Sequence, residues 1–132
     1  MLFVDASFWI ALRFPRDDWH DSASRLFRQY ADKPLLTTNL VRSETWTFLR
    51  GRVGHRSAVH AFESMSRSPR VEVAQVTAGL EEEAFEWLRR HDERSYSFVD
   101  ATSFALMRKK KITSVLAFDA DFSAAGFLEL RS

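Results

Sequence analysis

Short apolar runs alternate along the chain with longer segments whose apolar residues recur every three or four positions. The short runs predict strands at residues 2–4, 35–38, 71–76, 114–118 and 127–130. The periodic segments predict helices at residues 7–14, 19–31, 39–53, 55–67, 77–91 and 98–110, with a turn at 119–121. Prolines at positions 15, 34 and 69 follow three of these helices and mark their ends. Strands that alternate with helices in this way are typical of an α/β protein with a parallel sheet and right-handed crossovers.

Composition limits the classes of protein that this pattern can represent. The 132 residues contain no internal repeat or linker, so we expect one domain spanning residues 1–132. No stretch approaches the ~18 consecutive apolar residues of a membrane span, and the first residues do not resemble a secretory signal, so we expect no membrane association. The absence of cysteine excludes thiolate-bound metals and fits a cytoplasmic location. A formal net charge of +1 neither requires nor excludes a nucleic-acid partner.

Two aspartates directly follow predicted strands. Asp5 ends the first apolar run, and Asp119 ends the run at 114–118, with Asp121 two residues later. In open α/β sheets the functional crevice lies just beyond the carboxyl ends of the strands, where these side chains would meet. Each residue also has a structural interpretation, because Asp is a good N-cap for a helix that begins near Ser7 and a common residue in turns. Taken singly, Asp5 fits either role.

Two further acids lie in predicted helices. Glu44 is four residues from both Leu40 and Phe48, so it either interrupts an apolar stripe or sits at the edge of that stripe and reaches water. Asp100 stands three residues after Ser97, which is the spacing of a capping box, although Glu is the usual partner. Capping does not exclude metal binding, because both roles leave the carboxylate at the start of the helix.

These acids have a common chemistry if they converge on one edge of the sheet. Four or five carboxylates in one place repel one another strongly unless a divalent cation neutralises them. A site made only of oxygen ligands selects Mg²⁺ or Mn²⁺. Such an ion can polarise a phosphodiester and activate a water molecule for its hydrolysis.

The ordered set of motifs resembles PIN-domain ribonucleases, and specifically the VapC-type toxins of bacterial toxin–antitoxin pairs. The matching segments cover the chain from end to end: Phe3-Val4-Asp5-Ala6-Ser7, Thr37-Thr38-Asn39-Leu40-Val41-Arg42-Ser43-Glu44-Thr45, Ser97-Phe98-Val99-Asp100-Ala101-Thr102-Ser103 and Ala117-Phe118-Asp119-Ala120-Asp121-Phe122. The resemblance implies a PIN-like three-layer α/β/α fold with a central, mainly parallel sheet of four to five strands.

By resemblance, the chain is expected to be a Mg²⁺- or Mn²⁺-dependent endoribonuclease with Asp5, Glu44, Asp100 and Asp119 as catalytic residues. The metal would be held by Asp5, Asp100, Asp119 and, as a less certain member, Asp121. Ser7 matches a family position that hydrogen-bonds within the site. The expected partners are an RNA substrate, a small cognate antitoxin and a second copy of the chain in a homodimer. The alternatives are a PIN-fold nuclease for RNA processing or DNA cleavage, and a non-catalytic PIN-like binding module.

Basic residues near the predicted site are candidates for RNA phosphate contacts. Arg42, Arg50 and Arg52 lie on the Glu44 helix, Arg13 ends the first helix, and Arg16 and Arg56 are close by. The run from Arg108 to Lys111 is better explained as a cationic helix end that meets the helix dipole. The four histidines form no convincing ligand set. A phosphoacceptor receiver domain, the other α/β class with an acidic Mg²⁺ pocket, is disfavoured because Asp119 stands where its lysine should be.

Overall fold

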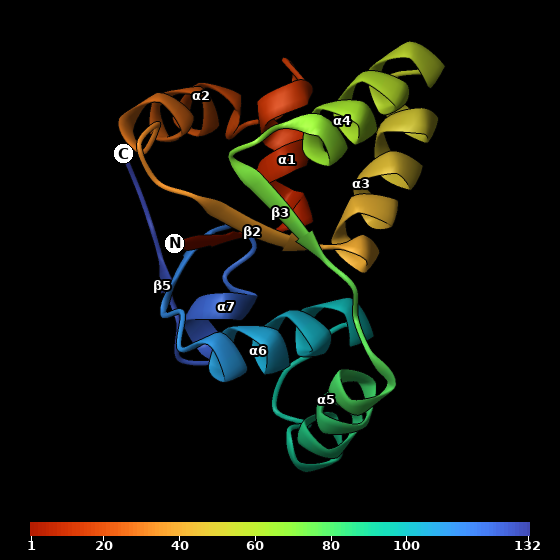
Figure 1. Cartoon of the computed structure of the whole chain (residues 1–132), viewed down its shortest axis with the longest axis vertical. Helices are drawn as coiled ribbons and strands as arrows, with labels where there is room; N and C mark the ends of the chain where they lie inside the picture. Colours follow the sequence, from red (N-terminus) through yellow and green to blue (C-terminus); the bar gives the residue numbers. More distant parts are fainter.

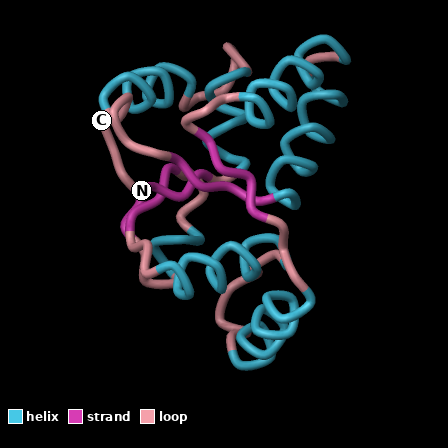
Figure 2. Tube along the Cα trace, viewed as in Figure 1, coloured by secondary structure: helices cyan, strands magenta, loops and turns pink.

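Five parallel strands form the central sheet of the computed structural model of residues 1–132. Figures 1 and 2 show this sheet between two groups of helices. The strands lie in the order β3-β2-β1-β4-β5. In the central strand, Phe3 pairs with Leu36 on one side and Val115 on the other. Their bounds are β1 Leu2–Val4, β2 Leu35–Thr38, β3 Val71–Ala74, β4 Ser114–Leu116 and β5 Leu128–Glu129. The prediction of a mainly parallel sheet of four to five strands is therefore confirmed, and every pairing is parallel.

Helices cover both faces of this sheet, which gives the expected three layers (Figure 1). One layer contains α1 (Ala6–Arg13), α2 (His20–Gln29), α3 (Asn39–Arg52) and α4 (His55–Arg67). The other contains α5 (Ala78–Arg90), α6 (Phe98–Lys110) and the single-turn α7 (Asp121–Ala124). None of these helices has the length and apolar character required to cross a membrane.

Three details of the predicted elements are wrong for physical reasons. The segment after Asp119 is not only a turn, because α7 begins at Asp121; a four-residue helix is too short to show a periodic pattern. Strand β3 ends at Ala74 because its partner β2 ends at Thr38, and the N–H of Val76 donates to Asn39 Oδ1 instead (2.7 Å). Strand β4 ends at Leu116, and the N–H of Phe118 donates to Ser7 Oγ at 3.0 Å.

The core packs against both faces of β1 and fixes the edge where the acids lie. Phe3 and Phe8 are fully buried, as are Phe104 of α6 and Phe122 of α7. Phe122 contacts both Phe3 and Phe104, with ring centroids 6.1 and 4.9 Å apart respectively. The chain leaves β1 towards β2 on one side, whereas β4 occupies the other side. The carboxyl ends of β1 and β4 therefore lie at a topological switch point, which is where open α/β sheets bind their ligands.

Candidate metal centre

Asp5 is fixed at the end of β1 by hydrogen bonds that use only one of its carboxylate oxygens. Its Oδ2 accepts from the backbone N–H of Ser7 (3.1 Å) and from Ser7 Oγ (2.8 Å), which makes Asp5 the N-cap of α1. Its backbone N–H donates to Leu116 O of β4 at 3.1 Å. Its Oδ1 is buried and has no hydrogen-bond partner. The capping and ligand interpretations of Asp5 therefore apply to different oxygens of the same side chain.

Asp100 lies in the first turn of α6 and forms the predicted capping box. Ser97 Oγ accepts from the N–H of Asp100 (2.9 Å), and Asp100 Oδ2 accepts from the N–H of Ser97 (3.2 Å). Asp100 is buried, and its neighbours in α6 from Ala101 to Met107 are buried as well. The helix start is thus held rigidly against the sheet, and it directs the carboxylate towards the ends of β1 and β4.

Asp119 follows β4 and completes a set of three acids. Asp5, Asp100 and Asp119 each offer one carboxylate oxygen, and these three oxygens lie within 4.8 Å of one another. Asp119 Oδ1 also accepts from the N–H of Asp121 (3.1 Å), which fixes the turn between them. The sequence places these residues 95 and 19 positions apart, so only the fold brings them together.

The electrostatics of the set disfavour three ionised carboxylates. Burial raises the pKa of Asp5 well above its usual range, and the charges of Asp119 and Asp100 raise it further. Burial and then Asp119 raise the pKa of Asp100 to about 7. The pKa of Asp119 is also raised, first by burial. None of these shifts has a neighbouring cation among its causes, whereas like charges raise the pKa in all three.

The three acids fit a divalent metal ion. They supply only oxygen donors, they converge at ligand spacing, and Asp5 Oδ1 is a buried acceptor without a donor. A buried carboxylate oxygen without a partner is expensive unless a cation or a donor satisfies it. A bound cation would satisfy this oxygen and remove the repulsion that raises the pKa values.

Glu44 lies beside this set and is not part of it. The residue is exposed on α3, between the half-buried Leu40 and Phe48, so it sits at the edge of the apolar stripe. Its carboxyl group is nevertheless partly shielded from water, and this desolvation, followed by the charge of Asp119, raises its pKa. Glu44, which belongs to the layer of α1 to α4, therefore lies near enough to Asp119 for the charge of Asp119 to act on it.

Asp121 is held by a different partner. Its Oδ1 accepts from Arg94 Nε at 2.5 Å, and Asp121 is not among the three acids that converge at ligand spacing. Arg94 belongs to the loop between α5 and α6, and its Nη2 also donates to the carbonyl of Asp119 (3.3 Å). This is the only ion pair in the structure that involves one of the predicted site residues.

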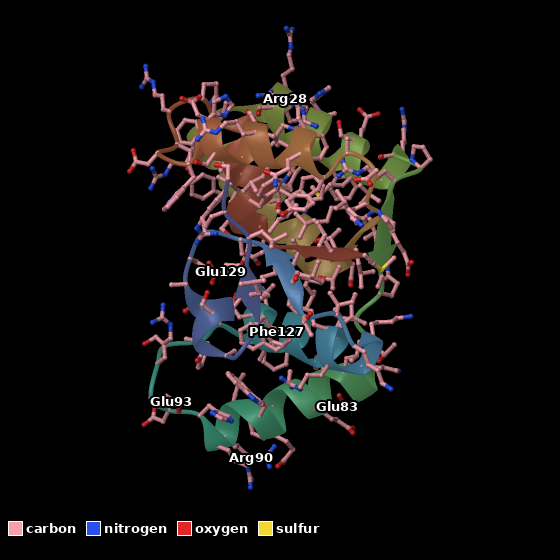
Figure 3. All side chains as sticks on the ribbon, turned by 90° about the vertical axis from the view of Figure 1, so that its left-hand side faces the viewer. Arg28, Glu83, Arg90, Glu93, Phe127 and Glu129 are labelled. Carbon is pink, nitrogen blue, oxygen red and sulfur yellow. The ribbon has the colours of Figure 1, made fainter.

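Sequence reasoning missed Arg94 and Glu129. Glu129 of β5 is buried, and its two oxygens accept from the N–H groups of Ala120 (3.3 Å) and Ser123 (2.9 Å) and from Arg131 Nη2 (2.9 Å). It thus supports the segment that carries Asp119, at mid-height between the two helical layers in Figure 3. A charge within the apolar run 127–130 was the available signal for Glu129. Arg94, in a polar loop, gave none.

The arginines predicted to contact RNA differ in their surroundings. Arg13 is half-buried, and burial lowers the pKa of its guanidinium. Arg42 donates to Ser66 Oγ (2.9 Å) and lies over the ring of Phe62, 4.4 Å from its centroid. Arg50 and Arg52 are exposed near the end of α3. The last two are therefore the more available for a phosphate.

Comparison with known proteins agrees with this geometry. The family model described as PIN domain matches residues 2–128. The 23S rRNA-specific endonuclease VapC20 of Mycobacterium tuberculosis, from strains CDC 1551 and H37Rv, is 58% identical over 99% of this chain and 98% of its own length. A crystal structure of M. tuberculosis VapC20, described as a toxin that cleaves the sarcin–ricin loop, is 56% identical, covers 100% of both chains and superposes with a TM-score of 0.92.

Proposed function

The chain belongs to the PIN-domain family, and we propose that it is a metal-dependent endoribonuclease that acts as the toxin of a toxin–antitoxin pair and cleaves 23S ribosomal RNA. The observation that carries this proposal is the convergence of Asp5, Asp100 and Asp119 without a neutralising cation. The similarity to a 23S rRNA-specific endonuclease extends over 99% of the chain. We propose that residues 1–132 form one catalytic domain.

The three aspartates would hold one divalent ion, Mg²⁺ or Mn²⁺, through oxygen ligands. When bound, such an ion lowers the pKa of a coordinated water and stabilises charge on the phosphodiester. Ser7 keeps Asp5 oriented by donating to its Oδ2 (2.8 Å), which leaves Oδ1 for the ion. Ser97 does the same for Asp100 through the capping box. Glu44, outside this set, would accept a proton or a hydrogen bond from the attacking water at its carboxylate.

The substrate proposal rests on the relatives. A cavity of about 570 Å³ lies between α5 and α6 and is lined mainly by charged residues, but it does not include the three aspartates. The acids instead lie beyond the carboxyl ends of β1 and β4, where Asp5 and Asp100 are buried and Asp119 is half-buried. We propose Arg50 and Arg52 as the first phosphate contacts, and Arg13 and Arg42 as weaker candidates because each is already packed.

The biological context follows from the same family assignment. We propose that a small antitoxin protein binds the chain and silences it, that two copies form a homodimer, and that the protein works in the cytoplasm beside ribosomal RNA. Co-expression with the neighbouring small open reading frame tests the first point, because the antitoxin should relieve toxicity. Light scattering of the purified chain tests the second.

Cleavage of defined RNA tests the activity. Purified chain is incubated with a 23S rRNA fragment in Mg²⁺, Mn²⁺ or EDTA, beside the Asp5→Asn and Asp100→Asn variants and a DNA copy of the fragment. We expect cleavage of RNA only, only with metal, and not by the two variants. The matched control is Asp21→Asn, an exposed acid in the first turn of α2. Cleavage in EDTA, or full activity of either variant, would contradict the proposed site.

A further inference from the structure

Arg94 is the one cation that the structure places against the acidic segment at residues 119–121. Its Nε donates to Asp121 Oδ1 (2.5 Å), and its Nη2 donates to the carbonyl of Asp119 (3.3 Å). Neither hydrogen bond uses Nη1. An arginine guanidinium presents five N–H donors in a rigid fork, so one edge can be anchored while the other binds an anion. The Arg94 side chain is 41% exposed, which leaves that second edge accessible.

The loop that carries Arg94 is anchored on both sides. Before it, His91 stacks on Trp87 with ring centroids 4.1 Å apart, and its Nδ1 contacts Glu93 Oε1 at 2.8 Å. After it, Tyr96 packs edge-to-face on Trp87 and on the buried Phe104, at 4.8 and 5.7 Å. Figure 3 shows Glu93, the neighbour of Arg94, on the same side of the molecule as Glu129. Arg94 is therefore presented by a fixed segment, as a preorganised electrostatic group requires.

Asp121 has the geometry of an orienting partner for this arginine. Its Oδ1 contacts Arg94, and its backbone N–H contacts Asp119 Oδ1 (3.1 Å), so the residue links the arginine to the ligand set. A carboxylate that binds a guanidinium at 2.5 Å is already neutralised, unlike the oxygens of the three converging aspartates.

We propose that Arg94 binds a phosphate of the RNA at the active site and that Asp121 positions Arg94 for this contact instead of binding the metal. The inference rests on the proposed nuclease function and adds a phosphate-binding residue to it. The fork would contact non-bridging oxygens of the phosphate at or next to the cleaved bond. There it would stabilise the negative charge that develops as water adds to phosphorus and the leaving oxygen departs.

Kinetics of four proteins test the proposal: wild type, Arg94→Ala, Asp121→Asn and the double variant, on the same 23S rRNA fragment with Mn²⁺. Loss of one preorganised donor group typically lowers kcat by about 100- to 1,000-fold, so we expect a loss of about 100-fold for Arg94→Ala. We expect a smaller loss, about 10-fold, for Asp121→Asn, because the arginine remains but is less well oriented. The double variant should be no slower than Arg94→Ala, because the two residues act as a unit.

Two readouts separate this role from a structural one. Arg94→Lys should recover only part of the activity, because lysine keeps the charge but lacks the fork. The increase of Tm on Mn²⁺ addition should be the same in Asp121→Asn as in wild type, since Asp121 is not a ligand. The matched control is the exposed pair Arg67–Glu63 on α4 (2.9 Å), whose Ala and Gln variants should cleave at the wild-type rate.

Three results would overturn the inference. One is an Arg94→Ala variant that cleaves as fast as wild type. The second is loss of the Mn²⁺-induced Tm increase in Asp121→Asn, which would make Asp121 a ligand. The third is multiplication of the two single losses in the double variant, which would mean independent roles. If wild type itself fails to cleave RNA with metal, or if Asp5→Asn cleaves as fast as wild type, the proposed function has failed instead.

Discussion

Replacing Asp100 by asparagine should stabilise the metal-free protein and abolish its stabilisation by metal. Asparagine has the shape of aspartate, and its Oδ1 can still accept from the N–H of Ser97, so the capping box survives. What disappears is a buried negative charge beside Asp119 and Asp5. The substitution therefore removes the repulsion, and the ligand, while it leaves the local fold intact.

The size of the effect follows from the pKa of Asp100, which burial and Asp119 raise from 3.8 to about 7. In the unfolded chain this carboxyl has lost its proton by pH 5, whereas the folded protein retains it until about pH 7. Raising the pH over this window therefore lowers the free energy of unfolding. Each pKa unit corresponds to 1.36 kcal/mol. The raised pKa of Asp100 therefore costs about 4 kcal/mol of stability at pH 8, where the buried carboxyl is ionised, and about 2 kcal/mol at pH 5, where folding must take up a proton. Asparagine has no such pH-dependent penalty.

Thermal unfolding in EDTA at pH 5 and pH 8 measures this difference directly. For a chain of this size, 1 kcal/mol of stability corresponds to a Tm change of about 3–4 °C. The Tm of Asp100→Asn should therefore exceed that of wild type by about 10–15 °C at pH 8, and by about half that amount at pH 5. With Mn²⁺ at about 100 times its Kd, wild type should gain about 2.7 kcal/mol and the variant nothing. The exposed control Asp21→Asn should show no increase in Tm. Two results would refute this reasoning from burial and like charges. One is a Tm of Asp100→Asn below that of wild type at pH 8, and the other is a Tm difference between the two proteins that does not increase with pH.

Two further substitutions test the supports of the site. Ser7→Ala removes the donor to Asp5 Oδ2 and the acceptor of the Phe118 N–H, so it should lower the free energy of unfolding by about 1–3 kcal/mol in urea titrations and weaken Mn²⁺ binding. Glu129→Ala leaves three donors without their acceptor, so it should lower the free energy of unfolding by about 3 kcal/mol. Glu129→Gln keeps one acceptor oxygen and should lower it by less. Equal losses in the two variants would argue against the hydrogen-bond role of Glu129.

Much of the fold could be predicted because its local signals agree with its global arrangement. The predicted strand at 2–4 becomes the buried β1, the run predicted at 114–118 contains β4, and the capping box at Ser97 and Asp100 starts α6 where the sequence places it. Predictions failed where an element's limit depends on a distant partner. Strand β3 ends at Ala74 because β2 has no residue beyond Thr38 with which it could pair. Residues 75 and 76 themselves give no local signal that the predicted strand 71–76 ends before them.

The sequence predicts the acids that follow strands, but not the positions of Glu44 and Arg94 around them. Asp5 and Asp119 carry a local signal, because each follows an apolar run at the edge where parallel strands end. The distance of Glu44 from the aspartates depends on how α3 packs against the sheet, which periodicity does not specify. Arg94 and Asp121 are paired across 27 positions of chain, and their contact arises only from the fold.

Helix capping and metal binding, the two roles that the sequence suggests for Asp5 and for Asp100, are compatible in the structure. Asp5 is the N-cap of α1, and Asp100 lies in the first turn of α6. Each uses Oδ2 for the capping hydrogen bonds, and for Asp5 the remaining oxygen is buried without a partner. The N-terminal ends of α1 and α6 favour negative charge, because their N–H groups carry the positive end of the helix dipole. The capping hydrogen bonds therefore hold the carboxylates towards one another and lower their pKa values. Burial raises the same pKa values by more, so both remain raised. A helix cap can hold a carboxylate in place, and only a cation can keep three of them ionised side by side.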